Sequence, residues 1–492
     1  MTDPERRAAP VAPSLTLAPS AELEPDAIGT TQDTIIGMAS SAPAATMAVT
    51  MAGLAAAAAY GGGPVILLCG VPMLIIANSY RRLNLWNANC GASFEWVGRA
   101  INPYLGFMTG WLMLAGYVVG TISVVVVLSP AVLAVFGSAS TSAWPNIGIS
   151  TALIIVMLVI AVAGIKITAR TQVVMAVFEY IVLIIVSIWG LTWELGHHAG
   201  TMPITRGWLS LSGIDGKGSL TAGLLIAVFM YSGWDASIYV NEEVKHRRVN
   251  PGRAAVFAVV LLTVLYILPQ MGLQGVTSSA KLQANASSAL IYVTQVIGGS
   301  AWAKVMAFAL VLSVIASTGT GIVASSRIAY GMASHRVLPP VLGQISRRFN
   351  TPAIGSIIIA VILIAATWAY LLSTSIANVF TDVVDVTGLL FAIFYVLTAL
   401  AAIVYYRRRI FSNAAEALLV GILPLASAAF LGWVFVKSLQ SAPWAQRWAL
   451  IGIVVAGLVL MLVARFVLQS SFFQIPRESA SSRSDAAPRA RQ

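Results

Sequence analysis

Two carboxylic acids lie within segments that are otherwise apolar enough to cross a membrane. Asp235 follows Gly233 in "FMYSGWDASIYV", and Glu179 interrupts "RTQVVMAVFEYIVLIIV". A lone charge at the centre of a bilayer costs about 3 kcal/mol or more, so such acids normally face a cavity and have a function. They are suited to bind a proton, a cation or the amino group of a substrate. The alternative is a hydrogen bond that only joins two helices.

The basic residues next to these segments indicate how deep the two acids lie. Asp235 precedes Lys245 by ten residues, and Glu179 follows Arg170 by nine. At 1.5 Å per helical residue these separations correspond to about 15 Å and about 13 Å. Because the hydrocarbon layer is about 30 Å thick, both acids are expected near its middle.

The first apolar segment, "IIGMASSAPAATMAVTMAG", is predicted to be kinked or broken. Pro43 has no amide hydrogen, and Gly37 weakens the helical turn before it. Ser41 lies eight residues after Asp33, which marks the start of the segment, and so is about 12 Å deep. A break at that depth requires a cavity for the backbone groups that it frees. The alternative is a kinked helix whose serines bond back to its own carbonyls.

These residues belong to a chain built for repeated membrane crossing. Of its 492 residues, 58% are hydrophobic and 10% are charged, whereas soluble domains carry about 25% charged residues. We count about twelve apolar runs long enough to span hydrocarbon. Their approximate ranges are 34–59, 64–80, 104–130, 147–165, 171–195, 219–244, 254–274, 302–331, 353–371, 380–406, 415–438 and 447–470. No removable signal peptide is predicted before them.

The basic residues also predict the orientation of the chain. Only six of its 29 Lys and Arg residues fall in one set of alternating loops, namely Arg206, Lys217, Lys281, Lys304, Lys437 and Arg447. The positive-inside rule places the other loops and both termini in the cytoplasm, which predicts a multi-pass protein of the cell membrane. The net charge of +11 therefore reflects topology, and no nucleic-acid partner is expected.

The chain is predicted to form one transmembrane domain, residues 31–472, between two polar tails. Residues 1–30 and 473–492 are rich in small and polar residues and are predicted to be disordered. The two cysteines are too few for a disulfide framework. No metal-ligand spacing, Ser/His/Asp set or phosphate-binding glycine loop is evident, so we expect neither an enzyme nor a cofactor or metal site.

Four local patterns occur in order along the chain. They are "GASFEWVGRAINPYLGFMTGW" (91–111), "GIKITARTQ" (164–172), "YSGWDASIYVNEEVKHRRVNPGR" (231–253) and "SSRIAYGMASHRVLPPVLGQISRRFNTP" (325–352). Together they resemble those of the amino acid–polyamine–organocation permeases, over about residues 28–470. The resemblance implies an all-α integral membrane protein of about twelve transmembrane helices, with two inverted repeats of five helices plus two more. It also implies broken helices one and six, here near residues 38–43 and 230–235.

The resemblance further implies a substrate site at these two breaks. In the family, half-helix ends bind the two ends of a zwitterion, which places the carboxylate at the first break and the amino group at carbonyls of the second. The residues implied for substrate binding are Ser40, Ser41, Ala42, Phe229, Tyr231, Ser232, Gly233 and Trp234. The chain departs from the family pattern in its Ser-Ser-Ala-Pro break, in Asp235 where Glu is more usual, and in Glu179 where some proton-coupled members have lysine.

The predicted function is secondary active transport of a small, neutral amino acid by alternating access. Burial disfavours a charged carboxylate, so Asp235 and Glu179 are expected to carry a coupling proton in symport. The alternative is a sodium ion between the first break and Ser317 or Thr318, completed by Glu179. Two other functions remain open: a polyamine or amine permease in which Asp235 binds a cationic nitrogen, and a membrane sensor of the same fold without transport.

Overall fold

The computed structural model describes residues 22–136, 143–196, 198, 200–211, 214, 219–373 and 376–479. Over these residues the regular secondary structure is helical, apart from an isolated bridge between Ile28 and Val244. In this part of the chain, ten helices are long and apolar enough to cross a membrane. The first, Thr30–Trp86, has 57 residues and enough length for two crossings. The protein is therefore the all-α integral membrane protein that the sequence predicts, while its count of about twelve crossings stays a prediction.

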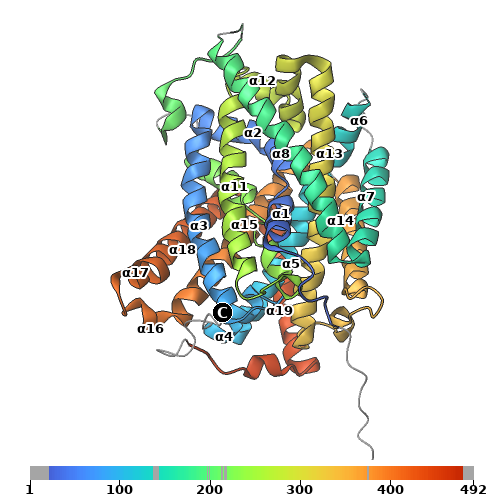
Figure 1. The fold of residues 1–492 in the computed structure, drawn as a ribbon, viewed down its shortest axis with the longest axis vertical. Coiled ribbons are helices and arrows are strands. Elements are labelled where there is room, and N and C mark those ends of the chain that lie inside the picture. The colour runs from blue at the N-terminus through green and yellow to red at the C-terminus, as the bar shows by residue number, and fades with distance from the viewer. Residues whose placement is uncertain are drawn as a thin grey trace, which may run out of the picture.

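Figure 1 shows how the helices are arranged. In chain order they are α1 (Thr30–Ser40), α2 (Pro43–Ala58), α3 (Gly62–Trp86), α4 (Ser93–Ala100), α5 (Pro103–Val125), α6 (Leu128–Val135), α7 (Ala143–Ala163), α8 (Ile165–Leu195), α9 (Leu220–Met230), α10 (Ala236–Tyr239), α11 (Asn250–Leu273), α12 (Ser279–Ala284), α13 (Ala289–Ser334), α14 (Ala353–Ser373), α15 (Ile376–Tyr405), α16 (Arg407–Ile410), α17 (Ala414–Glu416), α18 (Leu423–Ser441) and α19 (Trp444–Leu462).

Both predicted helix breaks are present. The first separates α1 from α2, where Ala42 has a left-handed backbone with φ of 44° and Pro43 begins the next helix. Proline suits a first helical position, because the amide hydrogen there would have no partner within the helix. The second break separates α9 from α10 at residues 231–235, and Gly233 has a φ of 100°, which glycine adopts without steric cost.

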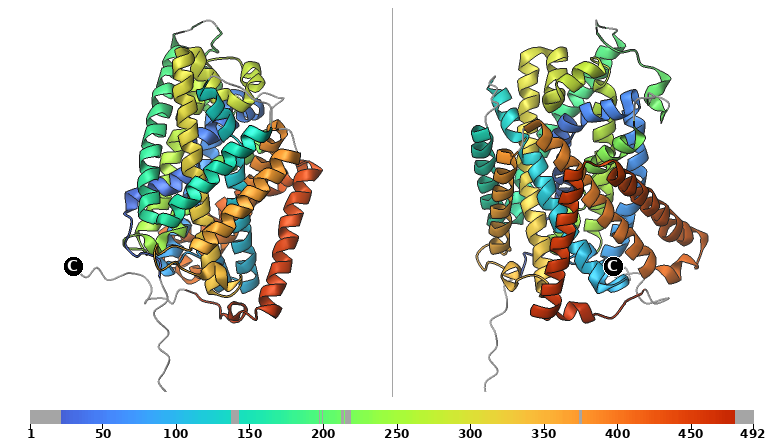
Figure 2. Two further views of the ribbon diagram at one scale, coloured as in Figure 1. Left: turned by 90° about the vertical axis from the view of Figure 1, so that its right-hand side faces the viewer. Right: turned by 180° about the vertical axis from the view of Figure 1, so that it is seen from behind.

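The two broken helices lie at the centre of the bundle. The half-helix α1 packs against α8, α10, α11 and α13, while α2 packs against α9 and α13. The long helix α15 packs against α9 and α5, and α5 also packs against α13, so longer helices surround the two breaks. At the edge of the bundle, α19 leaves large apolar side chains such as Val455 and Leu462 exposed (Figure 2). An apolar exterior of this kind is what a hydrocarbon solvent requires.

The described ends of the chain meet at one end of the bundle (Figure 2). Residues 22–29 lie in the region that the sequence assigns to a tail, yet the amides of Ala27 and Ile28 donate to the Glu243 carbonyl, at 2.8 and 3.2 Å. Near the other terminus, Glu478 pairs with Arg99 at 2.8 Å. Two ends on the same side of a membrane require an even number of crossings. Residues 1–21 and 480–492 of the predicted tails lie outside the described residues.

Candidate functional site

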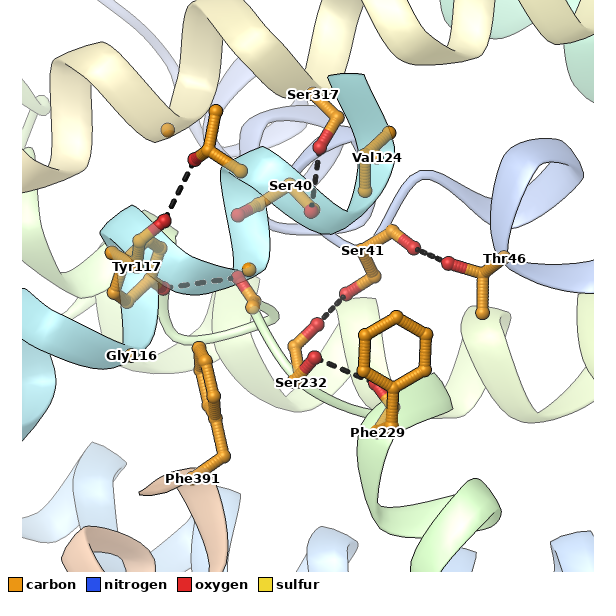
Figure 3. A pocket seen from close by; sticks show the side chains of 14 residues that line it. Ser40, Ser41, Thr46, Gly116, Tyr117, Val124, Phe229, Ser232, Ser317 and Phe391 are labelled. Atoms are coloured by element: carbon orange, nitrogen blue, oxygen red, sulfur yellow. Dashed lines mark hydrogen bonds between the residues drawn. The ribbon is translucent and has the colours of Figure 1, made fainter. Parts of the chain in front are cut away.

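A small cavity of about 30 Å³ lies between the two breaks (Figure 3). Of the described residues that line it, none is charged. They are Ser40, Ser41, Thr46, Gly116, Tyr117, Gly120, Thr121, Val124, Phe229, Ser232, Gly233, Ser317, Gly321 and Phe391. The site therefore offers hydroxyl groups, backbone at glycine positions and two phenylalanine rings.

Hydroxyl groups tie the two breaks to each other and to α13. Ser41 Oγ donates to the carbonyl of Ser232 at 2.7 Å, which joins the first break to the second. Ser317 Oγ donates to the carbonyl of Ser40 at 3.1 Å, and Thr46 Oγ1 donates to that of Ser41 at 2.7 Å (Figure 3). The end of a helix leaves such carbonyls without partners in the helix. Here serine and threonine side chains supply the missing donors.

The amides at the first break are already engaged in this conformation. The amide of Ser41 donates to the Met38 carbonyl and that of Ala42 to the Ala39 carbonyl, both at 3.1 Å. These bonds close the last turn of α1, and Ala42 does not line the cavity. A substrate carboxylate can reach the two amides only if this turn opens. The predicted carboxylate role of Ser40, Ser41 and Ala42 stays a prediction.

Glu179 lies beside the start of α2 and outside the cavity lining. Its Oε1 accepts a hydrogen bond from the amide of Ala44 at 2.7 Å and another from Ser313 Oγ at 2.8 Å. Ser313 Oγ also accepts from the amide of Ala45 at 3.3 Å. A carboxylate is favoured at a helix N-terminus because the free amides and the helix dipole point toward it. Glu179 thus connects α8, α2 and α13.

Asp235 is fully buried and bonded to three tyrosine hydroxyls. Tyr117 donates to its Oδ1 at 3.0 Å, Tyr395 donates to the same oxygen at 2.8 Å, and Tyr239 donates to Oδ2. Tyr117 also lines the cavity, so one hydroxyl separates the acid from the site. Because a tyrosine hydroxyl both donates and accepts, this cluster can hold Asp235 with or without a proton.

The other predicted residues divide between the cavity and its surroundings. Phe229, Ser232 and Gly233 line the cavity, as does Ser317. Tyr231 does not: its hydroxyl donates to Thr263 at 2.9 Å, toward α11. The Trp234 ring stacks on Tyr395, and Thr318 Oγ1 donates to the carbonyl of Val314, so neither side chain lines the cavity. The described residues contain no cluster of three or more His, Cys, Asp or Glu side chains that could hold a metal ion.

Sequence reasoning named only Ser317 from the wall formed by α5, α13 and α15, and missed the rest of that wall. Gly116 and Gly120 are four residues apart on α5, a spacing of small residues that lets another helix approach closely, and this signal was available. A side chain at Gly321 would place its Cβ 2.0 Å from Thr121 Oγ1, so glycine is required there. For Phe391 on α15 the sequence offers no local signal.

Two ion pairs close the end of the bundle where the chain ends meet. Glu243 and Arg327 form a fully buried pair, in which both carboxylate oxygens accept from the guanidinium. Burial raises the pKa of Glu95. The hydrogen bond and charge of His335 and the charge of Arg99 lower it by a larger amount, so the pKa of Glu95 lies below its usual value.

Comparison with known proteins gives a consistent result. A sequence profile described as amino acid permease matches residues 32–459. The D-serine/D-alanine/glycine transporter of Escherichia coli (strain K12) is 22% identical over 350 residues, covering 70% of this chain and 73% of its own. The low-affinity putrescine importer PlaP of Escherichia coli (strain K12) is 24% identical over 320 residues, covering 63% and 67%. The structure of MhsT in complex with L-phenylalanine superposes with a TM-score of 0.58 at 15% identity, over 84% of this chain and 99% of that one, which shows a shared fold.

Proposed function

Because this chain belongs to the amino acid permease family of the amino acid–polyamine–organocation superfamily, and is therefore a membrane transporter, we propose that it carries small, neutral amino acids by alternating access. The observation that carries this proposal is the central cavity, small and without a charged side chain among its described lining residues. A zwitterion has two opposite charges that half-helix ends and hydroxyls can bind. Its charges need no ionised side chain as a partner.

A polyamine or amine is the second candidate substrate. It is favoured by the similarity to a putrescine importer and by Asp235, which lies one tyrosine hydroxyl away from the cavity. Against it, a polyamine brings two or more positive charges without an accompanying anion, and buried charges require partners of opposite sign. Asp235 already accepts hydrogen bonds from three tyrosines, so an amine would have to displace at least one of them.

The proposed coupling ion is the proton. Asp235 and Glu179 are the proposed carriers, since each is buried close to one of the breaks and each has partners that orient its carboxylate. A sodium ion near Ser317 is the alternative, although the Ser317 hydroxyl here donates to the Ser40 carbonyl. The distribution of the basic loops supports the proposed orientation, in which the protein spans the cell membrane and both termini lie in the cytoplasm.

Uptake by proteoliposomes tests this function. Radiolabelled glycine, alanine, serine and leucine would be supplied outside, with putrescine and spermidine as competitors and with imposed proton or sodium gradients. We expect uptake of the small amino acids to rise as external pH falls and to persist in choline buffer. Asp235→Asn and Glu179→Gln should each flatten this pH response while the protein remains folded.

Three results would contradict the proposal in different ways. Uptake of radiolabelled putrescine or spermidine, with no uptake of any amino acid, would identify an amine permease. Amino acid uptake that stops when sodium is replaced by choline would retain the substrate and reject the coupling proton. A protein that binds these amino acids but never transports them would be a sensor.

A further inference from the structure

Asp33, in the first turn of α1, is a buried acid that the proposed transport mechanism does not use. Its exposed fraction is 0%, and neither carboxylate oxygen has a hydrogen-bond partner within the described part of the chain. Asp235 and Glu179 are equally buried but accept hydrogen bonds. Asp33 therefore differs from the other two acids in its surroundings and not in its burial.

The helices around Asp33 supply no cation to balance its charge. Four helices pack against α1, namely α8, α10, α11 and α13. Their buried titratable groups are engaged elsewhere or form no bond to Asp33. Arg327 pairs with Glu243, Tyr239 bonds to Asp235, and Tyr266 bonds to the Ser41 carbonyl. Glu179 accepts from the Ala44 amide, Glu194 accepts from the Gly275 amide, and the Tyr180 hydroxyl has no partner among the described residues. The basic residues at the same end of these helices, Lys166, Arg170 and Arg253, are exposed.

A carboxylate in such a place is stable only in its neutral form. An ionised group removed from water needs donors or a counter-ion, and without them it takes up a proton instead. The dipole of α1 favours a negative charge in its first turn, but that effect is small beside the cost of desolvating an unpaired charge. When α1 is packed into the bundle, Asp33 therefore holds a proton.

We propose that Asp33 is a proton-binding latch for the half-helix α1. The carboxylate takes a proton from the adjoining water when α1 packs into the bundle, and it returns that proton to the water when α1 moves out. Gly37, one turn further along, lies so close to the second break that a Cβ there would be 2.6 Å from the Trp234 carbonyl oxygen. A movement of α1 must therefore change its contact with the second break.

This inference rests on the proposed function only for the side of the membrane involved. With both termini in the cytoplasm, Asp33 exchanges its proton with the cytoplasm, and an alkaline cytoplasm would slow the closing of that end. The latch is separate from the coupling proton, because Asp33 is about 12 Å from the first break along α1. It sets how readily the transporter closes and not how much substrate it accumulates.

Hydrogen–deuterium exchange of the full-length protein in lipid nanodiscs tests the latch without any substrate. The readout is the exchange of residues 30–40 between pH 5 and pH 8, corrected for the intrinsic rate at each pH. Since opening releases one proton, its equilibrium constant should rise about tenfold per pH unit in the wild type. In the Asp33→Asn variant the opening equilibrium constant should be independent of pH. If that variant does not fold, Asp33→Leu should give the same result.

Asp235→Asn and Glu179→Gln are matched controls, since each also neutralises a buried acid. Both should keep the pH dependence of α1 exchange. Exchange that is independent of pH in the wild type would overturn the latch, as would a pH dependence that survives both Asp33 substitutions. Because transport is not measured, a failure here leaves the proposed function standing, and a failed uptake assay leaves the latch standing.

Discussion

Removing one partner of the buried pair between Glu243 and Arg327 should open the end of the bundle that the pair closes. Both side chains are 0% exposed, and Arg327 donates to both carboxylate oxygens, with Nη2 at 2.8 Å from Oε1. Without Glu243, the guanidinium keeps one weak bond, from Nη1 to the Val323 carbonyl at 3.4 Å. An uncompensated buried charge costs about 3–5 kcal/mol. That cost corresponds to an increase in the open population of roughly 10²-fold to 10³-fold or more.

The chain contains its own reporter for this opening. Cys90 is fully buried, and its Sγ lies 3.9 Å from Oδ1 of Asn241. Asn241 is two residues before Glu243, so Cys90 lies close to the ion pair. In a Cys69→Ala background, the rate at which a water-soluble maleimide modifies Cys90 measures how often this end opens. Glu243→Met and Arg327→Met should each raise that rate on the order of 100-fold or more.

A double-mutant cycle distinguishes charge from packing. The double variant, with Met at both positions, removes both charges and should react much more slowly than either single variant, because a well-packed apolar pair replaces the ion pair at little cost. Glu242→Gln is the matched control, since Glu242 is partly exposed and, among the described residues, accepts a hydrogen bond only from the Cys90 amide, at 2.9 Å. A double variant as reactive as the single variants, or single variants no faster than Glu242→Gln, would refute the charge argument.

Three further predictions concern the cavity and the ion pairs. Phe391→Ala enlarges the cavity and should lower the KM for leucine about tenfold relative to glycine, measured by competition. Gly321→Ala places a methyl group 2.0 Å from a threonine oxygen and should abolish uptake, whereas Gly432→Ala, with nothing within 4 Å, should not change it. Burial raises the pKa of Glu95, but His335 and nearby basic charge lower it below the usual 4.5. Its stabilising contribution is therefore present above pH 4.5 and is lost as the pH falls below that value. Glu95→Gln should cost about 1–3 kcal/mol at pH 7 and remove this acid sensitivity of thermal unfolding.

The helix breaks could be predicted because their causes are local. Pro43 cannot donate a hydrogen bond wherever it lies, and Gly233 marks a left-handed backbone within an apolar run, so both positions can be read without tertiary contacts. The burial of Asp235 and Glu179 could be predicted for a similar reason. A carboxylate near the middle of a span has to be enclosed by protein or water.

The partners of these acids could not be predicted, because they come from distant parts of the chain. Tyr117 and Tyr395 are 118 and 160 residues from Asp235 in sequence. The direction of Tyr231, away from the cavity, depends on its bond to Thr263 and not on its neighbours in the chain. From the sequence, Asp33 could be recognised only as the start of the first apolar segment. Its lack of hydrogen-bond partners depends on how α1 packs among the other helices, which the sequence does not show.

The uncharged lining of the central cavity determines how the membrane voltage acts on transport. A zwitterion has no net charge, so a cavity without charged side chains has the same net charge with or without its substrate. An electric potential of 100 mV supplies about 2.3 kcal/mol for each elementary charge that crosses the whole membrane. For a neutral amino acid, all of this energy acts on any coupled ion and on the protein's own moving charges. A substrate with a cationic side chain would add its own charge, and voltage alone would then drive it inward.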